Sequence, residues 1–307
     1  MTESNDKSPS ALIGPETPVR DAARMVLADR LNAVHAEFGR AAEITTNPEP
    51  IHQLRVTTRR AGAALAVFTD RLDTSAANSA RKRLRQLRRS AAQARDADVF
   101  LAVLETWAPG QPNVAKPGFY FLYGHTVAER RASQIHVVKA IERVESKWRR
   151  QAVHLIRGVR GGREPMSEFA APIIASLVRK FSAAIDAADF DDAPRLHSLR
   201  VAGKRVRYAL EILTLALPAD AVEPLHAALT NLQRILGIAQ DNTQAIRRLD
   251  RLLDDLATLR PRVLANVRGG IHAFRSFQRE QWAEQRAAFV AWKAKRPNLR
   301  GIDFGQR

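Results

Sequence analysis

The chain repeats one pattern of residues at two places that lie 145 positions apart. The first copy begins at His52 and reads His-Gln-Leu-Arg-Val-Thr-Thr-Arg-Arg; the second begins at His197 and reads His-Ser-Leu-Arg-Val-Ala-Gly-Lys-Arg. The same offset holds without a gap further along the chain, where Leu84 matches Leu229. Because this period is too long for a solenoid unit, it predicts an internal duplication at the scale of a domain.

The spacing of apolar residues predicts helices along almost the whole chain. From Pro18 onward these residues recur every three or four positions, and no segment alternates in the way of a half-buried strand. Helical stretches are predicted at about residues 25–38, 51–68, 77–105, 119–157, 166–187, 194–217, 224–256 and 261–294. With four stretches in each half, we expect an all-α fold of two pseudo-symmetric four-helix bundles.

Glycine and proline mark the expected limits of these bundles. They are frequent in residues 108–118, which we expect to form a loop, and in residues 158–165, which are typical of a domain boundary. The predicted division is a disordered leader at 1–17, a first bundle at 18–157, a linker at 158–165, a second bundle at 166–295 and a fraying tail at 296–307.

The composition favours a polyanion as the partner. The 307 residues carry a net charge of +17, and 40 of the 49 basic residues are Arg. The guanidinium group presents a planar fork of N–H donors that matches phosphate oxygens, which solubility alone does not require. The same charge disfavours a cationic partner.

Several classes of protein are excluded by what the sequence lacks. Without Cys there is no disulfide, thiol nucleophile or cysteine-bound metal. No apolar run approaches the ~18 residues of a membrane span, and the first 17 residues lack the apolar core of a secretory signal. We therefore expect a cytoplasmic protein that makes no membrane contact.

The sequence also predicts a protein without catalysis. It contains no phosphate-binding Gly-x-x-x-x-Gly-Lys loop and no His-Glu-x-x-His motif, and its eight His residues are scattered. We expect no catalytic residue, no metal site and no cofactor, although a divalent cation could accompany a bound polyanion. Hydrolysis or transfer of phosphoryl groups is the less favoured hypothesis.

The repeated pattern places basic residues on one face of a helix. At about 100° per residue, His52, Arg55 and Arg59 lie within roughly 60° of arc. Similar spacing joins basic residues elsewhere, and those we select are Arg81, Arg85, Arg88, Arg89, Arg143, Arg234, Arg275 and Arg279. A single basic stripe is usually a solvated face. Because like charges one turn apart repel, several such stripes indicate a bound anion.

These residues resemble the signature helices of the CHAD domain, the conserved histidine α-helical domain. The resemblance is carried by residues 52–68 and 197–213, especially 196–211, and by later landmarks at 94–99 and 239–241. It covers about residues 18–295 and implies two four-helix bundles that bind inorganic polyphosphate and associate with polyphosphate granules. The ligand-facing residues that it implies are His52, Arg55, Arg59, Arg60, His197, Arg200, Lys204, Arg205 and Arg207.

The two copies differ in a way that bears on this implication. The first has Gly62 and Ala63 where the second has Arg207 and Tyr208, so the basic patch of the first helix is smaller. Aromatic residues make up only 6% of the chain and do not interleave with the basic ones, unlike the stacking platforms of single-strand binders. A general polyanion-binding or nucleic-acid-binding protein is the alternative hypothesis.

Overall fold

The structure, a computed structural model, describes residues 13–296, 299 and 302–304. The helices are α1 (Val19–Ala42), α2 (Glu49–Val67), α3 (Thr74–Ser90), α4 (Ala92–Trp107), α5 (Lys116–Arg157), α6 (Met166–Asp186), α7 (Ala193–Leu213), α8 (Ala219–Leu259) and α9 (Pro261–Lys295). Short 3₁₀ turns join some of them, and no strand occurs among the described residues beyond one isolated bridge. The prediction of an all-α fold is confirmed. None of the described helices has the length and apolarity of a membrane span.

One helix that the sequence predicts as continuous is two helices. The predicted stretch 77–105 breaks at Ala91, between α3 and α4. Such a break leaves carbonyl groups at the end of α3 without helical donors. The guanidinium of Arg55 donates to the carbonyl oxygen of Arg88 at 3.0 Å, which satisfies one of them. The long-range bond stabilises the break, and neither Gly nor Pro marks it in the sequence.

The starts of the helices agree with the offset in the sequence. Helix α3 begins at Thr74 and α8 at Ala219, while α5 begins at Lys116 and α9 at Pro261, so both pairs are 145 residues apart. The break at Ala91 has no counterpart, because α8 runs on past the matching position. An origin of the two halves by duplication stays a prediction.

The described helices pack into two compact units. The first unit holds the described residues of 1–90, 137–230 and 296–307, and the second holds 91–136 and 231–295. Helices α5 and α8 therefore contribute to both units. Each unit takes helices from both halves of the chain. The units are defined by packing and not by sequence repeats, so the predicted bundle limits at 18–157 and 166–295 stay a prediction.

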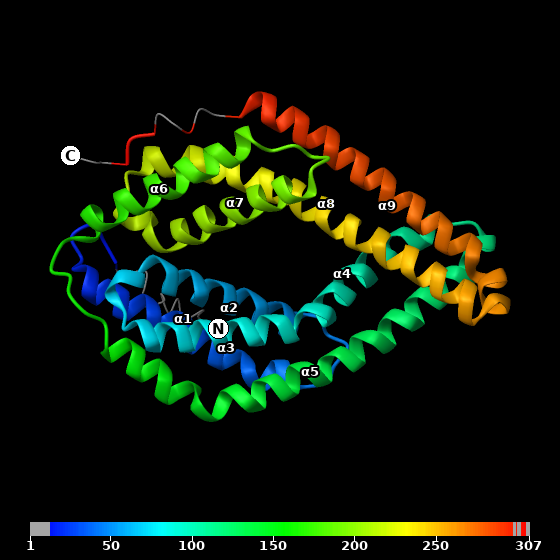
Figure 1. The fold of residues 1–307 in the computed structure, drawn as a ribbon, viewed down its shortest axis with the longest axis horizontal. Coiled ribbons are helices and arrows are strands. Elements are labelled where there is room, and N and C mark those ends of the chain that lie inside the picture. Colours follow the sequence, from blue (N-terminus) through cyan, green and yellow to red (C-terminus); the bar gives the residue numbers. More distant parts are fainter. Residues whose placement is uncertain (1–12, 297–298, 300–301, 305–307) are drawn as a thin grey trace, which may run out of the picture. The chain divides into compact units, whose positions relative to one another are not determined.

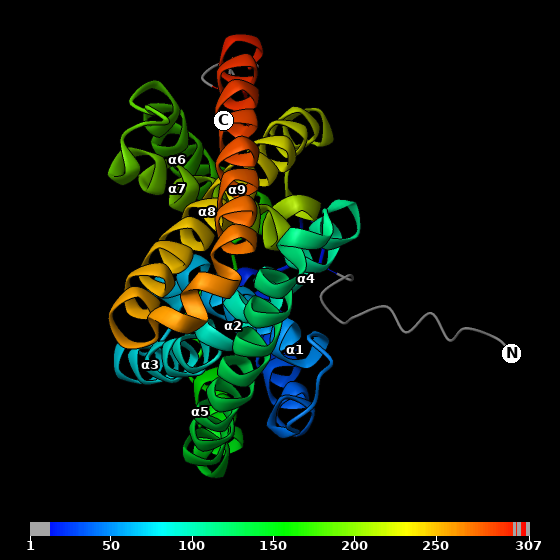
Figure 2. The same ribbon diagram turned by 90° about the vertical axis from the view of Figure 1, so that its right-hand side faces the viewer.

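In the first unit, α2 packs against α1, α3 and α7, and α6 lies along α7 (Figure 1). Figure 2 shows α6 and α7 side by side from a second direction. The Nε1–H of Trp148 in α5 donates to the carbonyl oxygen of Leu31 at 3.2 Å, and its ring meets Phe38 edge-on. At Gly203 in α7, an added Cβ would lie 3.2 Å from the ring of Phe181 in α6. The missing side chain therefore lets these two helices approach closely.

The connecting segments of the first unit are ordered. Residues 13–17, predicted as part of a disordered leader, hold a buried Ile13 and accept a hydrogen bond from Met166 N–H through the Thr17 carbonyl. The rest of that leader, residues 1–12, lies outside the described residues. The predicted linker is also ordered, because Val19 N–H donates to the Glu164 carbonyl oxygen at 3.0 Å.

The described part of the tail is likewise packed rather than frayed. Leu299 and Phe304 are 4% and 5% exposed. Arg296 forms an ion pair with Asp186 at the end of α6. The expectation of a fraying tail is thus wrong for these residues, because two apolar side chains find cover there.

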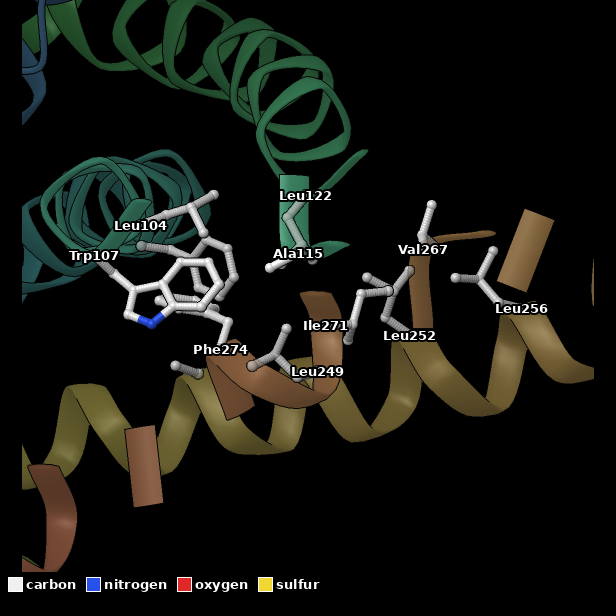
Figure 3. Close-up of a cluster of buried hydrophobic side chains, with 12 residues drawn as sticks. Leu104, Trp107, Ala115, Leu122, Leu249, Leu252, Leu256, Val267, Ile271 and Phe274 are labelled. Carbon is white, nitrogen blue, oxygen red and sulfur yellow. The ribbon is translucent and has the colours of Figure 1, made fainter. Parts of the chain in front are cut away.

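In the second unit, α4, the start of α5, the end of α8 and α9 share an apolar cluster (Figure 3). Phe274 of α9 is its centre: the ring lies 5.3 Å from that of Phe100 and 5.0 Å from that of Trp107. Leu249 and Ile271 are fully buried beside it. Because each of four segments contributes to one cluster, burial of apolar surface holds this unit together.

Two glycines allow a close backbone contact in the second unit. A Cβ on Gly270 of α9 would lie 2.3 Å from the Ala115 carbonyl oxygen, and a Cβ on Gly118 of α5 would lie 2.6 Å from the Cα of Gly270. The neighbouring Gly269 is exposed, and a Cβ added there would make only an ordinary contact, 4.0 Å from the carbonyl oxygen of Val114. The same substitution at the two adjacent positions therefore has opposite consequences.

We predict that Gly270→Ala lowers the free energy of unfolding by about 1–3 kcal/mol, because the new methyl group would overlap backbone atoms. Gly269→Ala should instead raise it by up to about 1 kcal/mol, since Ala is the better helix former. Urea unfolding followed by circular dichroism measures both. Equal effects of the two substitutions would contradict the close contact.

Candidate anion-binding cavity

The first unit contains a cavity of about 840 Å³ between α2, α3, α6 and α7. Each of these helices turns one face toward it, with lining residues three or four positions apart. Figure 1 shows α2 and α7 facing each other, as their direct contact requires. The cavity is therefore built from both repeated helices together with one neighbour of each.

Six basic residues line this cavity, and none of the described lining residues is acidic. Three come from α3, two from α7 and one from α2; they are Arg81, Arg85, Arg88, Lys204, Arg205 and Arg59. We call the cavity that these six residues line the basic cavity. All six are among the residues predicted from the sequence, and the fold brings them together from segments more than a hundred residues apart.

Hydrogen bonds to the backbone fix two of the basic side chains near the cavity. Arg81 donates from Nη2 to the carbonyl oxygen of Leu65 at 2.8 Å and to the hydroxyl of Thr69 at 2.7 Å. These bonds join α3 to the end of α2. Arg55 joins the same two helices through the carbonyl of Arg88. Since a guanidinium group carries five N–H donors, Arg81 keeps donors for an anion.

Like charges dominate the electrostatics of the cavity. Burial, together with the positive charges of Arg200, Arg59, Arg207 and Arg55, lowers the pKa of Lys204 to about 7. Burial, followed by the charges of Arg59 and Arg85, also lowers the pKa of Arg88. Both shifts mean that burial and the neighbouring positive charges destabilise the charged forms of Lys204 and Arg88. A bound anion would relieve that cost.

One acidic residue beside the cavity pairs with two of the predicted ligands. Glu211 of α7 accepts from Nε of Arg60 at 2.9 Å and lies 3.7 Å from Nε of Arg207. Arg207 also places its Cζ 4.7 Å from the ring centre of Tyr208. Arg60 and Arg207 are thus engaged beside the cavity rather than in its lining.

The comparisons with known proteins agree with this fold. The family model described as CHAD domain matches residues 25–250. The chain belongs to the CHAD domain family. It is similar to the crystal structure of the CHAD domain from the plant Ricinus communis, with a TM-score of 0.66 and 21% identity over 94% of this chain and 98% of that one.

A second similar structure is PptA from Streptomyces chartreusis. Its TM-score is 0.65 at 18% identity, over 91% of this chain and all of that one (100%). No curated protein matches the sequence. At these identities the two structures establish the likeness of the CHAD fold alone.

The remaining predicted residues of this CHAD domain do not line the basic cavity. In the first unit, His197, Arg89 and Arg143 are exposed, and His52 is half-buried. Arg55 and Arg200 lie outside the lining of the basic cavity, but their positive charges lower the pKa of Lys204 within it. Their roles as ligands stay predictions.

Three predicted residues belong to the second unit. Arg234 donates to the side-chain oxygen of Asn231 at 3.2 Å, and Arg275 pairs with Asp250 at 2.8 Å. Arg279 is exposed on α9. The structure does not gather these three into the basic cavity.

The uncharged part of the lining was not predicted from the sequence. Gly62 and Ala63 are small residues of α2 that leave room for the cavity, and α6 contributes a face that includes Ile173 and Leu177. The departure of the first copy at Gly62 and Ala63 was a usable signal, because two small residues replace two large ones there. No pattern in the sequence indicated that α6 would take part.

We predict that Lys204 reacts with amine reagents at a lower pH than any exposed lysine, since only the neutral amine is nucleophilic. Labelling followed by mass spectrometry should give a midpoint near pH 7 for Lys204, where its pKa lies at about 7. Lys82 and Lys139, both exposed, are the internal references. Labelling of Lys204 that rises only at the pH where these two react would contradict its buried, cationic surroundings.

Proposed function

We propose that this CHAD domain protein binds inorganic polyphosphate in the basic cavity. The observation that carries the proposal is the convergence of six basic side chains from three helices with no acidic residue in the described lining. Polyphosphate carries about one negative charge on each phosphate and offers no other group to recognise. A lining of several cations at close spacing suits such a chain.

The form of the site favours polyphosphate over duplex nucleic acid. A double helix is a rigid and much thicker ligand than a single chain of phosphates. A chain of single phosphates could reach Arg88 and Lys204, which are half-buried. General polyanion binding through the net charge of +17 is the alternative, because it needs no cavity.

We further propose that binding occurs without catalysis, in the cytoplasm and at polyphosphate granules. Enzymes that transfer phosphoryl groups hold their metal ions with carboxylate groups. The described lining contains no carboxylate that could do so. Incubation with polyphosphate and Mg²⁺ should therefore release no orthophosphate. The proposed location rests on the resemblance to the family.

We predict that Arg85→Met or Arg88→Met weakens polyphosphate binding by roughly ten-fold or more, because each removes about 1.5–3 kcal/mol of charged hydrogen bonding. Arg149→Met is the matched control: it removes the same charge from an exposed position of α5 in the same unit and should change the affinity less than about two-fold. Isothermal titration at fixed salt measures all three.

Competition separates this proposal from its alternative. Labelled polyphosphate is displaced with unlabelled polyphosphate, duplex DNA, RNA or heparin, normalised by charge, at two salt concentrations. A clear advantage of polyphosphate per charge supports the basic cavity. Competition in proportion to charge, together with equal losses in Arg88→Met and Arg149→Met, would establish general polyanion binding instead.

The affinity should also depend on pH through Lys204. Its pKa is about 7 in the free protein, and a bound polyanion raises it because the charged form gains a partner. Binding then takes up a proton, so the affinity falls as the pH rises from about 7 to 9. In Lys204→Arg, whose side chain stays charged, this decline should disappear. A decline of the same size in the variant would assign it to another group.

A further inference from the structure

The basic cavity has one wall that polyphosphate binding does not use. All six cations come from α2, α3 and α7, whereas α6 contributes Pro172, Ile173, Ser176 and Leu177. These lie on one face of α6, and Ile173 and Leu177 are half-buried. A hydrated chain of inorganic phosphates gains nothing from contact with apolar side chains. The wall therefore points to a ligand with an uncharged part.

The space beside this wall is kept open by small side chains. Gly62, Ala63 and Ala66 of α2 line the cavity, and larger residues would fill it. At Gly62 an added Cβ would already lie 3.4 Å from Nη1 of Arg88. The volume of about 840 Å³ lies within the range of about 300–1,000 Å³ that is usual for small-molecule sites. Room thus exists for a group next to the phosphates.

Two lining residues indicate the chemistry of this uncharged group. The aromatic ring of Tyr208 lines the cavity and offers a flat surface on which a planar group can stack. Its hydroxyl and that of Ser176 can hydrogen-bond to a sugar or to the polar edge of a base. An acyl chain would use neither the hydroxyls nor the ring. The lining therefore suits a nucleoside better than a lipid tail.

We propose that the basic cavity binds nucleoside polyphosphates, with the phosphates on the cations of α3 and α7 and the nucleoside between Tyr208 and the α6 wall. The phosphate half of this inference rests on the proposed function. The nucleoside half rests on Leu177, Ser176 and Tyr208, which polyphosphate binding leaves without a role.

The test compares ligands that carry the same number of phosphates. ATP and GTP are titrated against inorganic tripolyphosphate in buffer free of divalent cations. At least one nucleotide should bind five-fold or more tightly than tripolyphosphate although it carries less charge, because stacking and apolar contact are added. Nucleotides that bind no more tightly than tripolyphosphate would overturn the inference and leave the proposed function intact. If no phosphate ligand binds, the proposed function itself fails.

Variants locate the nucleoside. Tyr208→Leu and Leu177→Ala should weaken the binding of the preferred nucleotide at least five-fold and that of tripolyphosphate less than two-fold, so retained tripolyphosphate binding also reports a folded cavity. Val153→Ala, at an exposed position of α5, is the control. Arg88→Met should weaken both ligands. Nucleotide binding that survives Arg88→Met, or that Tyr208→Leu and Leu177→Ala leave unchanged, would place the nucleotide elsewhere and overturn the inference.

Discussion

Repulsion between like charges is the constraint on which the first unit depends. Six cations line one cavity between four helices, and the described lining holds no acid to offset them. Burial and neighbouring guanidinium groups lower the pKa of Lys204 to about 7, so the unit reduces its own charge when no ligand is bound. The helices stay together because apolar residues such as Leu54 and Phe181 are fully buried away from the cavity. Apolar packing thus stabilises a set of charges that would otherwise drive the helices apart.

Much of this fold follows from the sequence. Periodic apolar residues locate the helices, and the repeat at 145 residues agrees with the starts of α3 and α8. The break at Ala91 does not follow, because neither Gly nor Pro marks it and the hydrogen bond to the Arg88 carbonyl beside it comes from Arg55, which is distant in the chain. The order of residues 13–17 also depends on distant partners such as Met166. Local patterns predict local structure, and these two features are not local.

The candidate site follows from the sequence only in part. Helical phase predicts Arg81, Arg85 and Arg88 on one face, the repeat points to Arg59 and Lys204, and all five line the cavity. It could not separate these from Arg275, which pairs with an acid in the second unit. Membership of a site depends on which helices become neighbours, and helical phase does not contain that information. The α6 wall was missed for the same reason.

The hydrogen bonds from arginine to backbone carbonyls limit which substitutions such a sequence can tolerate. Arg81 holds the end of α2 through a planar group with donors in several directions. A lysine would keep the charge, but all three of its donors lie on one nitrogen, so a bond to Leu65 and a bond to Thr69 would leave one donor for an anion where the guanidinium keeps a planar fork. Exchange of Arg for Lys should therefore leave the stability unchanged at exposed Arg143 and lower it at Arg81, where the bonds to the end of α2 are weakened. The excess of Arg over Lys would then reflect the hydrogen bonds that join the helices as well as the binding of an anion.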